Sequence, residues 1–156
     1  MFRPDCPPVD ADALIDAVID REGRYVNHPA DRGGPTCWGI TEAVARAQGD
    51  DGAMRDLSRA DAVAIDRSIY WLRPGFDKIA LRAPQIAAEL FDTGVNMGTA
   101  TAVGFLQRAL NALNRTARDY PNIAVDRDIG ARTLSALDGF LKARGKGGET
   151  VLLRAM

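Results

Sequence analysis

The sequence predicts a mainly α fold with a small irregular or β-hairpin element, on three observations. Apolar residues recur at helical spacing in most segments, helix-capping residues precede several of these segments, and the alternation typical of strands is scarce. The chain has 156 residues, 46% of them hydrophobic and 26% charged. This length and composition suit one compact domain with its own core, so we expect a single domain in which two lobes can be distinguished.

Each predicted helix follows from an apolar face and from a start or stop signal. In the first, Leu14, Ile15 and Val18 fall on one face behind an acidic cap. Between the first two helices, Gly, Pro, Asn and Asp disfavour a long regular element, although Tyr25 and Val26 indicate a short strand or hairpin. The predicted helices run from Asp10 or Asp12 to Glu22, from Thr41 to near Gly49, from Ser58 to about Leu72, from Pro84 to about Val95, from Thr99 or Thr101 past Leu113, from Ala131 to about Leu137, and from Glu149 onwards.

Composition excludes several classes of protein. A net charge of −1 argues against nucleic-acid binding through bulk neutralisation of phosphates. No apolar window approaches the length of a membrane-spanning helix, and acidic residues interrupt the N-terminal segment, which therefore lacks the pattern of a secretory signal. We expect a protein made in the cytoplasm without a signal peptide, with no membrane insertion. The two cysteines, Cys6 and Cys37, form no disulfide framework, and both free thiols and a single bridge are open.

One irregular segment carries a candidate catalytic pattern. Glu22 is followed after eight residues by Asp31 and after four more by Thr36. Hydrolysis of a glycosidic bond needs one carboxylic acid to protonate the leaving oxygen and a second carboxylate to orient water or to attack carbon. A Glu half buried at a helix end stays protonated more readily than an Asp in a solvated, Gly-rich loop. The same residues are also common in turns and helix ends, so a structural role is open on spacing alone.

The order of residues from Glu22 to Thr41, EGRYVNHPADRGGPTCWGIT, resembles the signature of glycoside hydrolase family 108. The members of that family are bacterial and phage N-acetylmuramidases, whose pattern reads EGGY, a turn with Asp and Pro, and GGxTxxGIT. The similarity continues in ELFDTGVNMG at residues 89–98 and in LQRALN at residues 106–111. Further on, DRDIGARTL at residues 126–134 resembles the DGxIGxxT turn of the family's C-terminal peptidoglycan-binding portion.

The resemblance implies a lysozyme-like single domain in which the hairpin element carries the active-site loop. Residues 1–98 correspond to a catalytic muramidase lobe, and residues 99–156 to a helical lobe resembling a peptidoglycan-binding portion. Carried over by position, Glu22 is the general acid, and Asp31 and Thr36 position or activate water.

The sequence departs from the family pattern at three positions. Arg24 replaces the second Gly of EGGY, and His28 stands where the family often has Asp. Arg127 replaces the Gly of DGxIG, a position where the family makes a tight turn.

Two pairs of residues are candidates for substrate binding. Tyr25 and Trp38 could stack on sugar rings in a saccharide groove. Asp92 and Asn96 lie four residues apart on one helix face, from which they could hydrogen-bond N-acetyl or lactyl groups, or brace the loop from Gly33 to Thr36. Gln107 stands beside the apolar stripe of its helix and is expected to be satisfied structurally.

Tyr70 and Trp71 are further aromatic candidates for the groove. Because adjacent residues on a helix point in different directions, at least one of the two is expected in the core.

Two rival functions come from the same stretch of sequence. Cys37, with His28 as base, is the pattern of a cysteine hydrolase, which would act as a peptidase or amidase on the peptide part of the wall. A non-catalytic peptidoglycan-binding module that has lost the chemistry is the other. A zinc site built from Cys6, His28, Cys37 and Asp31 lacks any recognisable ligand spacing, so no metal or cofactor is predicted.

The sequence therefore predicts an endolysin-like, bacteriolytic muramidase that hydrolyses the β-1,4 bond between N-acetylmuramic acid and N-acetylglucosamine. The preferred mechanism is a single displacement with inversion. Its partners would be the glycan strands of peptidoglycan, and a monomer is expected. Without a signal, it would reach the wall after release as a phage or prophage endolysin or through dedicated export, with a pore-forming release partner or an inhibitor as further candidate partners.

Overall fold

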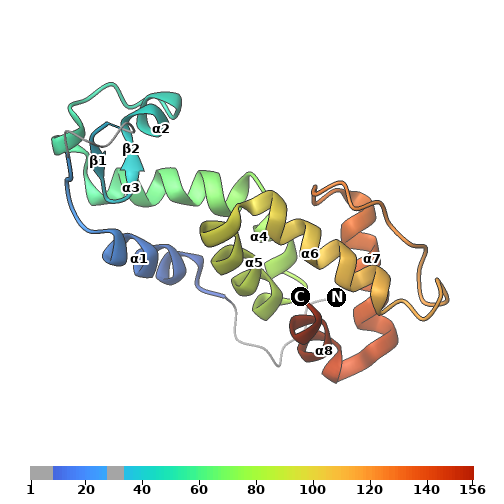
Figure 1. Cartoon of the computed structure of the whole chain (residues 1–156). Helices are drawn as coiled ribbons and strands as arrows, with labels where there is room; N and C mark the ends of the chain where they lie inside the picture. Colours follow the sequence, from blue (N-terminus) through green and yellow to red (C-terminus); the bar gives the residue numbers. More distant parts are fainter. Residues whose placement is uncertain (1–8, 28–33) are drawn as a thin grey trace. The chain divides into compact units, whose positions relative to one another are not determined.

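The structure is a computed structural model of the chain, and it describes residues 9–27 and 34–156. The described residues are mainly helical with one small hairpin, as predicted (Figure 1). The elements are α1 (Ala11–Glu22), β1 (Thr36–Cys37), β2 (Ile40–Thr41), α2 (Glu42–Ala47), η1 (Met54–Asp56), α3 (Arg59–Asp66), η2 (Arg67–Leu72), α4 (Phe76–Ala80), α5 (Pro84–Met97), α6 (Thr99–Ala112), α7 (Ala131–Arg144), η3 (Gly145–Gly147) and α8 (Gly148–Ala155).

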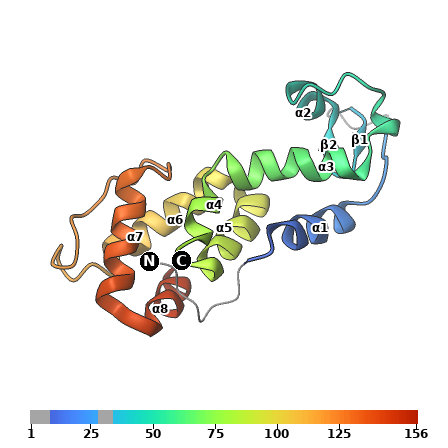
Figure 2. The same ribbon diagram turned by 180° about the vertical axis from the view of Figure 1, so that it is seen from behind.

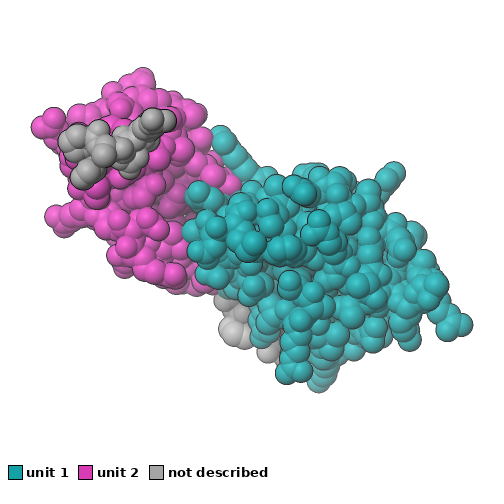
Figure 3. All heavy atoms as spheres, viewed as in Figure 1, with its two compact units in different colours: residues 1–9, 70–156 teal, residues 10–69 magenta. Residues whose placement is uncertain are grey.

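Contacts within the chain divide it into two compact units (Figure 3). Residues 10–69 form the first, called here the N-terminal unit, and residues 70–156 belong to the second, called here the C-terminal unit. The division falls inside η2, a π-helical stretch that directly follows α3. The boundary expected between residues 98 and 99 concerns functional lobes, and it stays a prediction.

The predicted capping residues begin their helices. The Asp10 carboxylate accepts hydrogen bonds from the backbone N–H groups of Asp12 and Ala13, both at 3.1 Å, at the start of α1. The Thr41 hydroxyl accepts from the Val44 N–H at 3.3 Å at the start of α2. Since the first N–H groups of a helix have no partner inside it, these side chains fix where each helix starts.

Two of the differences from the predicted helices concern α4 and α7. The five-residue α4 was not predicted, because one turn with buried Phe76 and Ile79 is too short to show a helical period. Helix α7 continues past Leu137 to Arg144, since Phe140 and Leu141 bury a further turn. Across the described residues, no helix combines the length and apolar character required to cross a membrane.

The C-terminal unit has an apolar core made by several helices. Helix α5 packs against α4, α6 and α8, and α6 also packs against α7 (Figures 1 and 2). Trp71 is 4% exposed and meets the rings of Phe76 and Phe91 edge-on at centroid distances of 6.5 and 6.1 Å. Trp71 is therefore a core residue, which confirms that at least one aromatic of its pair is buried. The core also includes fully buried Ile79, Ile86, Leu90, Leu106, Leu110, Leu137, Phe140 and Leu152.

The N-terminal unit relies on a smaller core and on ion pairs. Ile15 and Ile19 are fully buried on the face of α1 that packs against α3. At the edge of the same contact, the Arg59 guanidinium lies 2.7 Å from the Asp16 carboxylate and 2.9 Å from that of Asp20. Arg67 pairs with Asp12 in the same way. These exposed pairs contribute little free energy each, so the two isoleucines carry most of the stabilisation of this contact.

Candidate functional site

Glu22 stands at the point where α1 ends. It is the last residue of the helix, and Gly23 follows with φ of 77°, a backbone conformation that stops the helix. The side chain of Glu22 is exposed, so the predicted half-buried Glu is wrong for this structure. A Cβ on Gly39 would lie 2.9 Å from Cγ of Glu22, and only a glycine lets the hairpin turn approach so closely.

The turn against Glu22 belongs to the predicted hairpin. Strands β1 and β2 are antiparallel, with Thr36 opposite Thr41 and Cys37 opposite Ile40. Trp38 and Gly39 form the two-residue turn with φ of 55° and 78°, and positive φ at both positions is the feature of a type I′ hairpin turn. The hairpin begins later than the predicted Tyr25, because Val26 only bridges Thr36.

Thr36 is held in place by hydrogen bonds of its backbone. Its N–H and C=O each make a 2.8 Å hydrogen bond with Val26. The residue is half-buried, and its hydroxyl makes no hydrogen bond to any residue that the structure describes. Asp31 and His28 lie outside the described residues, so the predicted grouping of Glu22, Asp31 and Thr36 stays a prediction.

The two aromatic candidates of this unit differ in how much of the ring is free. The Trp38 Nε1–H donates to the Leu57 carbonyl at 3.0 Å, and the Arg24 guanidinium lies 5.8 Å from its ring centroid. Arg24, which departs from the family pattern, therefore covers one face of Trp38 through a cation–π contact. Tyr25 is 41% exposed. Of the two predicted sugar-stacking residues, Tyr25 has the freer ring, and both roles stay predictions.

Cys37 is a poor candidate for a nucleophile. It is 3% exposed, its Sγ lies 3.9 Å from the Leu57 carbonyl oxygen, and burial raises the pKa of the thiol. Because the thiolate is the reactive form, this environment argues against the predicted cysteine hydrolase. Its intended base, His28, and the zinc candidates Cys6 and Asp31 lie outside the described residues. Among residues 9–27 and 34–156, no three His, Cys, Asp or Glu side chains gather as metal ligands.

Asp66 is a carboxyl group that the sequence reasoning missed. It lies at the end of α3, is 6% exposed, and makes no hydrogen bond to another described residue. Burial, as the larger cause, and the negative charge of Glu22 together raise the pKa of Asp66 from 3.8 to about 6. The two carboxyl groups therefore interact electrostatically. A signal existed, because Asp66 follows Ala62 and Ile65 at the spacing of one buried helix face.

Asp92 and Asn96 belong to α5 in the C-terminal unit. Both are exposed, and the Asn96 side-chain amide donates to the Asp92 backbone carbonyl at 2.8 Å. This bond uses one N–H of the Asn96 amide. It involves the backbone of Asp92 and not its carboxylate. Their predicted roles in binding substrate or bracing the loop stay predictions.

The DRDIG motif of the C-terminal unit is organised by Gln107. This residue is fully buried, its Nε2 donates to the Asp126 carboxylate at 2.6 Å, and its Oε1 accepts from the Arg127 N–H at 2.9 Å. The structural role predicted for Gln107 is confirmed. The bond from Gln107 Nε2, with one from the Asp128 N–H, holds the pKa of Asp126 below its usual range. Arg127 has φ of 65°, so the turn forms although arginine replaces glycine.

Comparisons with known proteins match both parts of the chain. The family model described as "Glycosyl hydrolase 108" matches residues 15–98, and the model described as "Predicted Peptidoglycan domain" matches residues 101–156. A solved structure of SagA from Brucella abortus is similar to this chain, with 27% sequence identity and a TM-score of 0.60. The similarity covers 93% of this chain and 76% of the SagA chain. A search of curated proteins found no match.

Proposed function

We propose, from the premise that the chain belongs to the glycosyl hydrolase 108 family, that it hydrolyses the glycan strands of bacterial peptidoglycan. The match over residues 15–98 includes Glu22, Thr36 and the hairpin that lies against Glu22. The match of residues 101–156 to a peptidoglycan domain supports the same polymer as substrate. The observation that carries the proposal is the close approach of Gly39 to Glu22 inside the matched region, since it fixes the acid beside the hairpin turn of the motif.

The proposed bond is the β-1,4 linkage between N-acetylmuramic acid and N-acetylglucosamine. Glu22 donates a proton to the glycosidic oxygen as the bond from that oxygen to the anomeric carbon breaks. Water attacks the same carbon from the opposite face and gives its proton to Asp31, while the Thr36 hydroxyl orients the water. This is a single displacement with inversion. Carboxyl groups about 6.5 to 9.5 Å apart would suit it, whereas about 5 Å would suit a covalent intermediate.

The Thr36 hydroxyl, which bonds to no residue within 9–27 and 34–156, supports its share of this mechanism. The hydroxyl has no described partner, and its backbone is fixed by pairing with Val26 on one side and with β2 on the other. A side chain that is positioned by rigid backbone and keeps its hydrogen-bonding capacity can hold a water without reorganising.

We propose the biological setting together with the activity. An endolysin-like enzyme made in the cytoplasm would act on the wall after release through a pore or after dedicated export. A pore-forming release partner or an inhibitor would then be its partners besides peptidoglycan, and it would act as a monomer.

Product analysis tests the proposed reaction. Purified sacculi are digested with wild type, the products are reduced with borohydride, and the reduced ends are identified by mass spectrometry. Muramic acid at the reducing ends is the expected result. Glucosamine at the reducing ends would show that the other glycosidic bond of the glycan strand is cleaved. New amines without new reducing ends would instead favour a peptidase or amidase and would overturn the proposal.

Two carboxylate variants test the role of Glu22 in the same assay. Glu22→Gln should release reducing ends about a hundredfold more slowly or worse, because it removes the general acid. Glu42→Gln is the matched control, since this residue pairs with Arg46 on α2 and has no part in the mechanism. Equal rates for Glu22→Gln and wild type would contradict the assignment. Binding of sacculi without any release by wild type would favour the non-catalytic module.

A further inference from the structure

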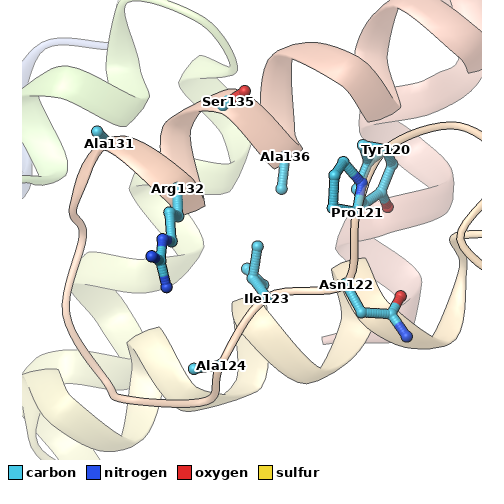
Figure 4. A pocket seen from close by; sticks show the side chains of 9 residues that line it. All are labelled: Tyr120, Pro121, Asn122, Ile123, Ala124, Ala131, Arg132, Ser135 and Ala136. Atoms are coloured by element: carbon cyan, nitrogen blue, oxygen red, sulfur yellow. The ribbon is translucent and has the colours of Figure 1, made fainter.

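The C-terminal unit contains a cavity that plays no part in the proposed hydrolysis. Its volume is about 410 Å³, and it lies between the start of α7 and the chain segment that precedes it. Figure 4 shows the side chain of Arg132 extending from α7 and that of Ile123 extending from the segment, both into the space between them. The lining also includes Pro121, Ala124, Ser135 and Ala136. All of these residues fall within the part of the chain matched as a peptidoglycan domain.

The segment side of the cavity is held in place by two side-chain amides, one on α6 and one just after its end. The Asn111 side chain donates to the Ile123 carbonyl at 2.8 Å and accepts from the Ile123 N–H at 2.9 Å. The Asn114 amide donates to the Tyr120 carbonyl at 2.7 Å and to the Asn122 side chain at 2.8 Å. Because half-buried Asn111 and buried Asn114 fix this irregular backbone, the wall is formed before any ligand arrives, which lowers the entropic cost of binding.

Tyr120, the aromatic residue at one end of the cavity, has a structural role. Tyr120 is 7% exposed, and its hydroxyl donates to the Leu110 carbonyl at 2.6 Å. Its ring fills the place where a Cβ on Gly139 of α7 would lie, at 3.1 Å. A sugar ring needs an open aromatic face for stacking, and Tyr120 does not offer one.

The helix side of the cavity carries a cation that is not paired with any described residue. Arg132 is exposed and makes neither a hydrogen bond nor an ion pair with any residue in the described ranges. Asp126 is close enough to interact with it electrostatically, but the Asp126 carboxylate already accepts from Gln107 and from the Asp128 N–H. The guanidinium therefore keeps its donors for a ligand, in the fork geometry that matches a carboxylate.

The chemistry of the lining defines the ligand. The apolar side chains of Pro121, Ile123 and Ala136 suit small methyl groups, and the guanidinium of Arg132 suits a carboxylate. We propose that this cavity binds the carboxylate-bearing peptide stem of peptidoglycan, with a stem carboxylate on Arg132 and an alanine methyl against Ile123 and Ala136. The choice of polymer rests on the proposed function, whereas the choice of peptide over glycan rests on the cavity itself.

A soluble peptide probe tests the inference without any hydrolysis. The probe is the tetrapeptide L-alanyl-γ-D-glutamyl-L-lysyl-D-alanine, titrated into the full chain by calorimetry and by amide chemical shifts. Binding should perturb the amides of residues 121–136. Arg132→Gln should weaken binding about tenfold or more, because a charge-assisted hydrogen bond is lost. Arg108→Gln is the matched control, since Arg108 is exposed on α6 outside the cavity.

Two further comparisons test the peptide carboxylates and the space inside the cavity separately. The tetrapeptide with both carboxylates amidated should bind at least about tenfold more weakly than the free acid, as expected when the charge on the acceptor is removed. Ala124→Leu, an exposed change that fills part of the cavity, should also weaken binding while the unfolding midpoint stays unchanged.

Specific results would overturn the inference. Equal binding of the free acid by Arg132→Gln and wild type would do so, and so would equal binding of the diamide and the free acid. Shifts of the cavity amides by N-acetylglucosamine tetramer and not by the peptide would assign the cavity to glycan. Because the probe contains no glycosidic bond, failure here leaves the hydrolysis measured on sacculi untouched, and a failed hydrolysis assay leaves this titration readable.

Discussion

The two compact units hold their irregular backbone in place by different means. In the C-terminal unit, residues 120–128 are fixed by the side-chain amides of Gln107 and Asn111 on α6 and of Asn114 just after that helix. In the N-terminal unit, the backbone after Glu22 is fixed by one bridge between Val26 and Thr36 and by a hairpin of two residues per strand.

The cores of the two units also differ, and the C-terminal unit has the larger core. Of the largest fully buried side chains among the described residues, only Ile15 and Ile19 belong to the N-terminal unit. Its helices are joined at the edge by exposed ion pairs, which contribute little stability. The unit that carries the proposed acid is therefore the more easily opened one, as expected for regions that must admit a large substrate.

The largest expected effect on stability comes from Gln107 in the C-terminal unit. Gln107→Ala should lower the free energy of unfolding by about 3 kcal/mol, because it leaves the Arg127 N–H, the Thr133 hydroxyl and the Asp126 carboxylate short of a buried partner. Urea denaturation measures it. Gln85→Ala, at an exposed position of α5, is the control and should cost less than about 0.5 kcal/mol. Equal costs would show that the amide does not organise this segment.

In the N-terminal unit, the close approach of Gly39 to Glu22 predicts an effect on rate. Gly39→Ala would drive a methyl group into the Glu22 side chain and should slow release of reducing ends by about a hundredfold, the usual result of misplacing a catalytic group by about 1 Å.

Gly49→Ala is the control for the Gly39 variant. Gly49 has φ of 89° and open space where its Cβ would stand, so alanine there has the same backbone strain without the collision. It should lose roughly 1 kcal/mol of stability and keep its rate. If both variants lose activity equally, the loss in Gly39→Ala is explained by backbone strain and not by contact with Glu22.

Asp66 predicts a dependence of stability on pH. Its pKa in the folded chain, about 6, lies above the ordinary 3.8, so the folded state binds this proton more tightly than the unfolded state. The contribution of Asp66 to stability therefore falls as pH rises from about 4 to about 6.

Removing that charge should reverse the effect. Asp66→Asn should raise the free energy of unfolding by on the order of 2 kcal/mol at pH 7.5 and by much less at pH 4. Thermal or urea unfolding at the two pH values measures the difference. Asp51→Asn, at an exposed position, is the control and should change little at either pH. A gain of equal size at both pH values would contradict a buried, charge-sensitive Asp66.

The smallest expected effect concerns the turn at Arg127. Arg127→Gly should stabilise the chain by less than about 1 kcal/mol, because the relief of a left-handed residue is offset by the greater freedom of glycine in the unfolded chain. Ala124→Gly in the same segment is the control and should destabilise by about 0.5 kcal/mol or more, because no left-handed backbone is relieved there. A loss of stability in Arg127→Gly would mean that the contact of Arg127 with Gly104 outweighs the strain.

The sequence predicted the fold where local signals agree. The caps Thr41 and Ser58, and Asp10 as one of two alternatives, follow from the sequence because a side-chain oxygen before a helical period is a local pattern. Helix α4 was missed because its burial of Phe76 depends on packing by other elements.

The candidate site was harder to predict from the sequence than the fold was. The order of residues pointed to Glu22, Asp31 and Thr36, but not to Asp66, whose proximity to Glu22 depends on the packing of α1 against α3. The exposure of Glu22 was also not predicted, since burial at a helix end is decided by tertiary neighbours. Arg24 replaces a glycine of the family pattern, and its contact with Trp38 is seen only in the structure.

One measurement tests the central claim that residues 10–69 carry the acid of a peptidoglycan hydrolase. Glu22→Gln and wild type are incubated with purified sacculi, and sedimented protein and released reducing ends are measured in the same tubes. The account predicts that the variant sediments as wild type does, since its C-terminal unit is unchanged, and releases reducing ends about a hundredfold more slowly. A variant that releases reducing ends at the wild-type rate would contradict it.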